Sequence, residues 1–110
     1  MMRIGWPKDL LNGGTAMKKI YKYELPIGGH TITIDDPIEK VLSIQLQYGG
    51  PTMWAMIDFD LPNKSTHIIS VGTGWEITAG VDEYIGTVQD EQGFVWHYFS
   101  QEIKELDKAP

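Results

Sequence analysis

Residues 42–59 read LSIQLQYGGPTMWAMIDF, and this stretch decides the fold class. Its first part alternates apolar and polar residues, with Leu42, Ile44, Leu46 and Tyr48 on one face. A period of two is typical of a β-strand that buries one face. Glycines and a proline at 49–51 then supply turn chemistry, and a second apolar run occupies residues 53–59. The stretch therefore predicts two strands joined by a tight turn.

The same pattern extends in both directions along the chain. Further alternating or apolar runs occupy residues 21–25, 31–34, 66–71, 83–88 and 94–99, separated by turn-forming residues at 26–29, 35–37, 61–64, 72–74 and 90–93. Several runs are apolar on both faces, which is typical of strands that are central or line an interface. Seven strands with hairpins as the default connection predict an all-β fold, a small antiparallel sandwich or barrel. We also expect a short C-terminal helical turn within residues 101–108.

Two regions differ in pattern. Residues 1–16 follow neither period and end in two glycines, which indicates an N-terminal arm or extension, or a start-site artefact. Residues 17–110 form the predicted single antiparallel β domain. If the arm is docked, its anchors are the apolar residues Ile4, Trp6, Leu10 and Leu11.

Composition excludes several classes of protein. The chain has 110 residues and no cysteine, which rules out disulfide scaffolds, thiol catalysis and cysteine-ligated metal sites. Its net charge of −6 opposes binding to a nucleic-acid polymer. We find no membrane span and no signal peptide, which favours a cytoplasmic protein without a membrane partner. A core this small also predicts stabilisation by homo-oligomerisation.

Gly72-Thr73-Gly74 is the first candidate for a binding site. Glycine permits positive φ angles and close approach of a ligand, so this loop can present backbone N–H groups to an anion. The alternative is a bulge or tight turn, because the loop has neither a dinucleotide-binding spacing nor a Walker lysine.

Aromatic residues near this loop form the second candidate. Twelve aromatic side chains exceed what seven short strands need for a core, and Trp75, Tyr84 and Trp96 are candidates to stack on a nucleobase. Phosphates would be held by loop N–H groups, Thr73, Thr87 or a lysine such as Lys18, Lys19 or Lys22. His97 is a ligand-binding candidate, with a core or interface histidine as the alternative. For any single ring, core packing remains the alternative.

Catalytic and metal-binding patterns are weak. Asp58 and Asp60 fit one face of a strand at a separation compatible with paired-carboxylate chemistry, or they form a solvated strand end. The three histidines lack ligand spacing, and no serine has a recognisable histidine and acid. We therefore predict no catalytic residues, no metal site and no cofactor.

Four segments carry a resemblance to a known family. Residues 18–26 (KKIYKYELP), 71–74 (VGTG), 84–88 (YIGTV) and 94–97 (FVWH) resemble a family of short proteins common in phage and prophage genomes. The resemblance covers about Met17 to Ser100 and extends to phage sponge proteins that sequester cyclic nucleotide signals of bacterial immunity such as CBASS. It implies a phage-encoded anti-defence protein, acting in the cytoplasm of the infected bacterium, that binds a small signalling nucleotide without cleaving it.

Three other functions remain open. One is an inhibitor that adds a strand or an aromatic patch to a host protein. The second is a small nucleotide-cleaving enzyme, which would need an acid/base constellation around Asp58, Asp60 or His97. The third is a structural accessory of the virion.

Overall fold

The structure, a computed structural model, describes residues 17–77 and 80–101. Within them lie seven strands: β1 (Lys18–Glu24), β2 (Thr31–Ile34), β3 (Ile38–Gln47), β4 (Gly50–Asp58), β5 (Thr66–Gly72), β6 (Val81–Gln89) and β7 (Val95–Gln101). The predicted all-β fold is confirmed. Gln101 ends β7 rather than starting a helical turn; the rest of that predicted turn and the predicted arm lie outside the described residues.

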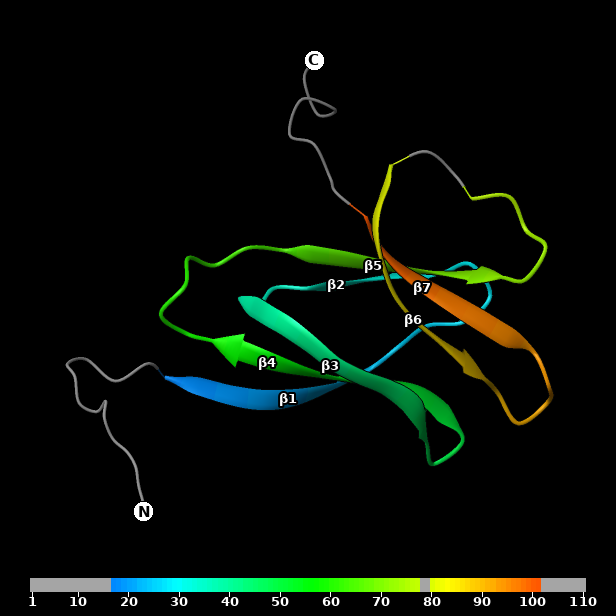
Figure 1. Cartoon of the computed structure of the whole chain (residues 1–110), viewed down its shortest axis with the longest axis horizontal. Coiled ribbons are helices and arrows are strands. Elements are labelled where there is room, and N and C mark those ends of the chain that lie inside the picture. The colour runs from blue at the N-terminus through cyan, green and yellow to red at the C-terminus, as the bar shows by residue number, and fades with distance from the viewer. Residues whose placement is uncertain (1–16, 78–79, 102–110) are drawn as a thin grey trace.

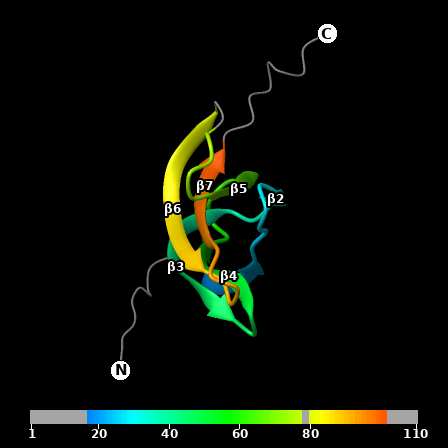
Figure 2. The same cartoon turned by 90° about the vertical axis from the view of Figure 1, so that its right-hand side faces the viewer.

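The strands form two sheets that pack as a sandwich (Figure 1). Sheet A has the order β1-β4-β3, and sheet B has the order β2-β5-β7-β6. Every pairing is antiparallel. Figure 2 views the sandwich from the side, with the curved β6 at one side and β2 at the other.

Most connections are not hairpins, which corrects the sequence-based expectation. Only the β3–β4 and β6–β7 turns join strands that pair with each other. The β1–β2, β2–β3 and β4–β5 connections pass from one sheet to the other, and β5 reaches β6 around β7. Turn-forming residues permit a reversal, but the choice of partner depends on which apolar faces meet in the core.

The core lies between the sheets and comes from alternate strand positions. Met53, Ala55 and Ile57 of β4 are fully buried against Ile68 and Tyr98 of sheet B. The Tyr98 hydroxyl donates a 2.7 Å hydrogen bond to the Pro26 carbonyl, which satisfies a buried polar group. Burial raises the pKa of Tyr98, because it disfavours the phenolate.

Strands with apolar residues on both faces occupy central positions, as predicted. β4 is the middle strand of sheet A, and β5 and β7 are interior strands of sheet B. β6 is an edge strand with two irregularities in its pairing to β7. No helix in the described part of the chain is long and apolar enough to cross a membrane.

Candidate functional site

A pocket with aromatic walls lies at one end of sheet B, between the β5–β6 loop and the β6–β7 hairpin. Its volume is about 490 Å³, within the range of small-molecule sites. We call it the tryptophan pocket; its lining residues are Gly72, Thr73, Trp75, Gly93, Phe94, Val95 and Trp96. Four of these were predicted from the sequence: Gly72, Thr73, Trp75 and Trp96.

The Trp75 indole is held by packing against backbone that lacks side chains. A Cβ at Gly72 would lie 2.7 Å from Trp75 Cε2, and a Cβ at Gly29 would lie 3.2 Å from Trp75 Cζ3. Trp75 also meets Trp96 edge to face, with ring centroids 5.5 Å apart. The absence of a side chain at Gly72 therefore makes room for the indole, a packing role that the sequence did not indicate.

Gly74 keeps the conformational role expected of it. Its φ of +88° is strained for other residues, and a Cβ there would meet no atom within 4 Å. The Trp75 N–H closes the turn on the Gly72 carbonyl at 3.1 Å. The backbone at Gly74 is therefore open to a ligand.

The predicted stacking residues differ in exposure. Trp75 is 51% exposed, whereas Trp96 is 7% exposed and belongs to the core. Trp96 therefore forms a wall of the pocket, and Trp75 offers the accessible ring face. Phe94, which sequence analysis missed, offers a second exposed ring, with its centroid 6.2 Å from that of Trp96. Its position directly after the turn at 90–93 was the available signal.

Three of the other predicted residues, Tyr84, Thr87 and His97, form a hydrogen-bonded chain with Thr73 on the outer face of sheet B. His97 Nε2 is 2.8 Å from Thr73 Oγ1, and His97 Nδ1 is 3.0 Å from Thr87 Oγ1. Thr87 in turn bonds the Tyr84 hydroxyl at 2.5 Å. Thr87 and His97 are direct cross-strand partners, which explains their contact.

Thr73 connects these two groups. It lines the tryptophan pocket, and its hydroxyl bonds His97 of the outer face. Because successive residues of a strand point to opposite faces, Trp96 and His97 cannot both face one ligand in the pocket. Seven of the eight predicted residues therefore divide between a pocket and a polar network that supports its loop, and the eighth, Gly74, lies in the turn before Trp75.

Asp90 gives the tryptophan pocket an anionic neighbour. Its carboxylate accepts hydrogen bonds from Trp96 Nε1 at 3.0 Å and from the backbone N–H groups of Gln92 and Phe94 at 2.9 Å. These donors, the Trp96 indole first, hold the pKa of Asp90 below its usual range. The carboxylate stabilises the β6–β7 turn and anchors the indole of Trp96.

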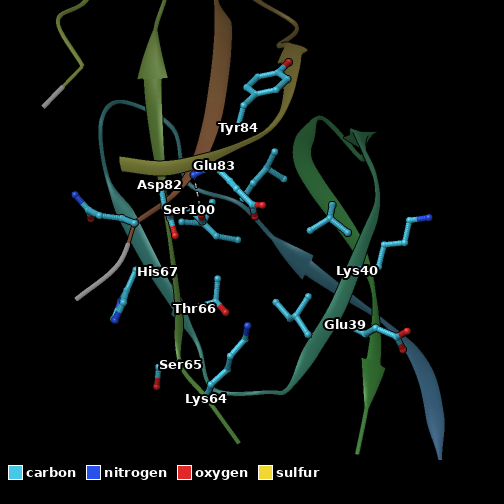
Figure 3. Close-up of a pocket in the computed structure, with 15 residues that line it drawn as sticks. Glu39, Lys40, Lys64, Ser65, Thr66, His67, Asp82, Glu83, Tyr84 and Ser100 are labelled. Atoms are coloured by element: carbon cyan, nitrogen blue, oxygen red, sulfur yellow. Dashed lines mark hydrogen bonds between the residues drawn. The ribbon is translucent and has the colours of Figure 1, made fainter. Parts of the chain in front are cut away.

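A larger, more polar groove lies between the sheets, with a volume of about 1110 Å³. Its walls are β3 and β6, each an edge strand of its sheet among residues 17–77 and 80–101, and its lining also includes Thr66, Ile68 and Ser100. Figure 3 shows Lys64 and Thr66 pointing into this groove, while Lys40 lies on the far side of β3. Ser100 Oγ accepts a hydrogen bond from the Glu83 N–H at 3.1 Å. We call it the inter-sheet groove.

The remaining chemical candidates have structural partners. β4 ends at Asp58, so Asp60 lies in the following turn rather than on the same strand face. Asp58 Oδ1 accepts the Asp60 N–H, and Asp60 Oδ2 accepts the Met17 N–H. His67 Nδ1 shares a 2.8 Å hydrogen bond with Thr33. Within residues 17–77 and 80–101, no three His, Asp or Glu side chains are grouped to hold a metal ion.

Fold and site together define a small antiparallel β-sandwich with an aromatic pocket at the end of one sheet. The chain belongs to the family described as "Domain of unknown function (DUF7352)", whose model matches residues 17–108. No curated protein and no solved structure matches the chain.

Proposed function

We propose that this protein binds a small signalling nucleotide at the tryptophan pocket and holds it without cleaving it. The observation that carries the proposal is the Trp75 ring, 51% exposed, in a pocket of about 490 Å³. The open backbone of Gly74 directly precedes Trp75 in the chain, although Gly74 does not itself line the pocket. A planar base gains stacking energy on such a ring, and the neighbouring loop offers polar groups to the rest of the ligand.

The charges around the pocket orient the ligand. Asp90 is ionised and lies on the hairpin side, beside Trp96. Phosphates avoid that side and face the backbone N–H groups of Thr73 and Gly74, because the Thr73 hydroxyl is engaged by His97 Nε2 at 2.8 Å. No lysine or arginine is among the described residues that line the pocket, so stacking supplies most of the affinity. We therefore expect binding to depend only weakly on salt concentration.

The arrangement of acid and base groups favours binding over cleavage. Both ring nitrogens of His97 bond threonine hydroxyls, and the ring lies on the outer face of sheet B. Asp58 and Asp60 accept backbone N–H groups at the end of β4, in the other sheet. These groups do not converge on one point of the tryptophan pocket, as a general acid and base would.

The biological setting follows from the family resemblance. A phage-encoded protein of this kind would act in the cytoplasm of the infected bacterium, where it would lower the free concentration of a cyclic nucleotide immune signal. Sequestration requires abundance and affinity, and it requires no catalytic group.

Titration calorimetry with cyclic di- and trinucleotides and ADP-ribose derivatives tests this proposal. We expect one class to bind the wild type, and Trp75→Ala to weaken that binding by about 5- to 150-fold, equivalent to about 1–3 kcal/mol. Phe94→Ala tests the other exposed ring of the pocket in the same way. Tyr48→Asn is the matched control, because Tyr48 is an exposed aromatic residue in the β3–β4 turn with a φ of 54°. Absence of heat with every ligand would overturn the proposal.

The inter-sheet groove favours a second candidate function, inhibition of a host protein by capture of an extended segment. β3 and β6, which are edge strands in the part of the chain that the structure describes, flank about 1110 Å³ of space. Free edges offer unpaired backbone groups to an added strand. A variant that fills the groove floor, Ser100→Phe, would abolish capture by this route and leave nucleotide binding intact.

A further inference from the structure

The outer face of sheet A carries an apolar patch that no other described strand covers. In β4, Met53, Ala55 and Ile57 are fully buried, so the intervening Trp54 and Met56 point outward. The strand register places Ile20 of β1 beside Met56, and Ile20 is 60% exposed. We call Ile20, Trp54 and Met56 the sheet A patch. Trp54 and Met56 are half-buried, so Ile20 supplies the most exposed part of this patch. Contiguous apolar residues at a surface mark interaction sites.

Charged residues of opposite sign flank this patch at the two ends of β1. The outward positions of β1 are Lys18, Ile20, Lys22 and Glu24, which pair with Asp58, Met56, Trp54 and Thr52 of β4. The strand therefore has a basic end at Lys18 and an acidic end at Glu24. Lys18 Nζ is 3.0 Å from Glu39, and both side chains are well exposed. That exposed pair leaves the Lys18 ammonium accessible to a second carboxylate.

We propose that the sheet A patch is the interface of a homodimer, in which a second copy of this chain packs face to face on the first. The two-fold axis lies in the plane of the interface, perpendicular to the strands, above the row that joins Tyr21 and Ala55. This axis exchanges the ends of each strand. It brings Trp54 of one protomer against Met56 of its partner, and Lys18 of one protomer against Glu24 of its partner.

A second copy fits this face better than an unrelated partner. When the two-fold axis reverses the strand direction, each residue of the face meets a residue of complementary chemistry on the partner. Sulfur–aromatic contacts between Trp54 and Met56 form twice, as do the charge pairs between Lys18 and Glu24. Lys22 falls over Ile20 of the partner, where its aliphatic stem covers apolar surface while its ammonium keeps the 2.7 Å hydrogen bond that it donates to Gln47 Oε1. Face-to-face sheets pack about 10 Å apart, which these side chains can fill.

Light scattering and sedimentation equilibrium on the whole chain test the dimer. The wild type at micromolar concentration should give about twice the 12.4 kDa chain mass. Met56→Glu should give the monomer mass, since it buries two unpaired carboxylates. Ile77→Glu, the same kind of change at an exposed apolar residue of the β5–β6 loop, should leave the dimer unchanged. Circular dichroism verifies that each variant keeps its strands.

Charge reversal tests the proposed arrangement itself. Lys18→Glu or Glu24→Lys alone should raise the dimer dissociation constant roughly 5- to 30-fold, because each change creates two like-charge contacts per dimer. The double variant Lys18→Glu/Glu24→Lys should recover most of the loss. A monomeric wild type at all concentrations would overturn the proposal. Equal weakening in the double variant and in the singles would overturn it as well, because the two residues would then not face each other.

Discussion

Gly72→Ala tests whether the tryptophan pocket is built as described. A Cβ at Gly72 would lie 2.7 Å from Cε2 and 2.9 Å from Nε1 of the Trp75 indole. Ordinary carbon contacts are about 3.5–4.0 Å, so the ring has to move by roughly 1 Å or leave its place. The half-exposed ring would swing toward solvent and lose its edge-to-face contact with Trp96.

The expected loss of stability follows from the buried half of the indole. A fully buried indole covers about 150–250 Å², so half of it is about 100 Å², or about 2.5 kcal/mol at 25 cal/mol per Å². Ring repacking and the reduced entropy of the unfolded chain offset part of this loss. We expect Gly72→Ala to cost about 1–2.5 kcal/mol and to lower the melting temperature by about 5–15 °C.

A double-mutant cycle with Trp75→Ala isolates the contact. Urea unfolding followed by circular dichroism gives the free energy of unfolding for each variant. In the Trp75→Ala background Gly72→Ala should be neutral or slightly stabilising, because the indole that it displaces is gone. Gly50→Ala is the control, since a Cβ there meets only the Gln47 carbonyl oxygen at 4.0 Å. An equal loss in both backgrounds would refute the packing described for Trp75.

Two further predictions concern pH. The Trp96 indole holds the pKa of Asp90 low, so the stability that Asp90 supplies is present above the unfolded pKa of about 3.9 and is lost as pH falls through the lower folded pKa. Asp90→Asn should therefore reduce the loss of unfolding free energy at acid pH. An unchanged acid loss in this variant would contradict the role given to Asp90. Burial raises the pKa of Tyr98, so the free energy of unfolding should decline above about pH 10. Tyr98→Phe should reduce that decline, and it should cost about 1–2 kcal/mol at neutral pH because the Pro26 carbonyl loses its hydrogen-bond donor. An equally steep alkaline decline in Tyr98→Phe would show that Tyr98 is not its cause.

The strands were predictable because their buried faces follow a simple period. In β4 the fully buried Met53, Ala55 and Ile57 alternate with Trp54 and Met56, which are apolar as well, so this run indicated a strand but not which of its faces turns inward. Strand partners were not predictable in this way. β1 pairs with β4 and β2 with β5, across connections that carry ordinary turn residues. Their choice depends on long-range packing, to which local patterns are insensitive.

The candidate site was predicted in part for the same reason. Gly72 to Trp75 stand together in the sequence, so the loop and its aromatic residue could be recognised as one unit. The contact between Thr87 and His97 depends on strand register, and the burial of Trp96 depends on which face of β7 meets sheet A. The inter-sheet groove combines residues from four strands, so no local sequence motif could predict it.

Retention of a nucleotide in unchanged form tests the central claim most directly. The wild-type protein is incubated with a panel of cyclic di- and trinucleotides and ADP-ribose derivatives, separated from free ligand, and heated to release what it holds. Chromatography of the released material should recover one ligand class intact, in an amount close to one ligand per binding site, and Trp75→Ala should retain far less. Recovery of altered products, or no retention of any ligand, would contradict binding without cleavage at the tryptophan pocket.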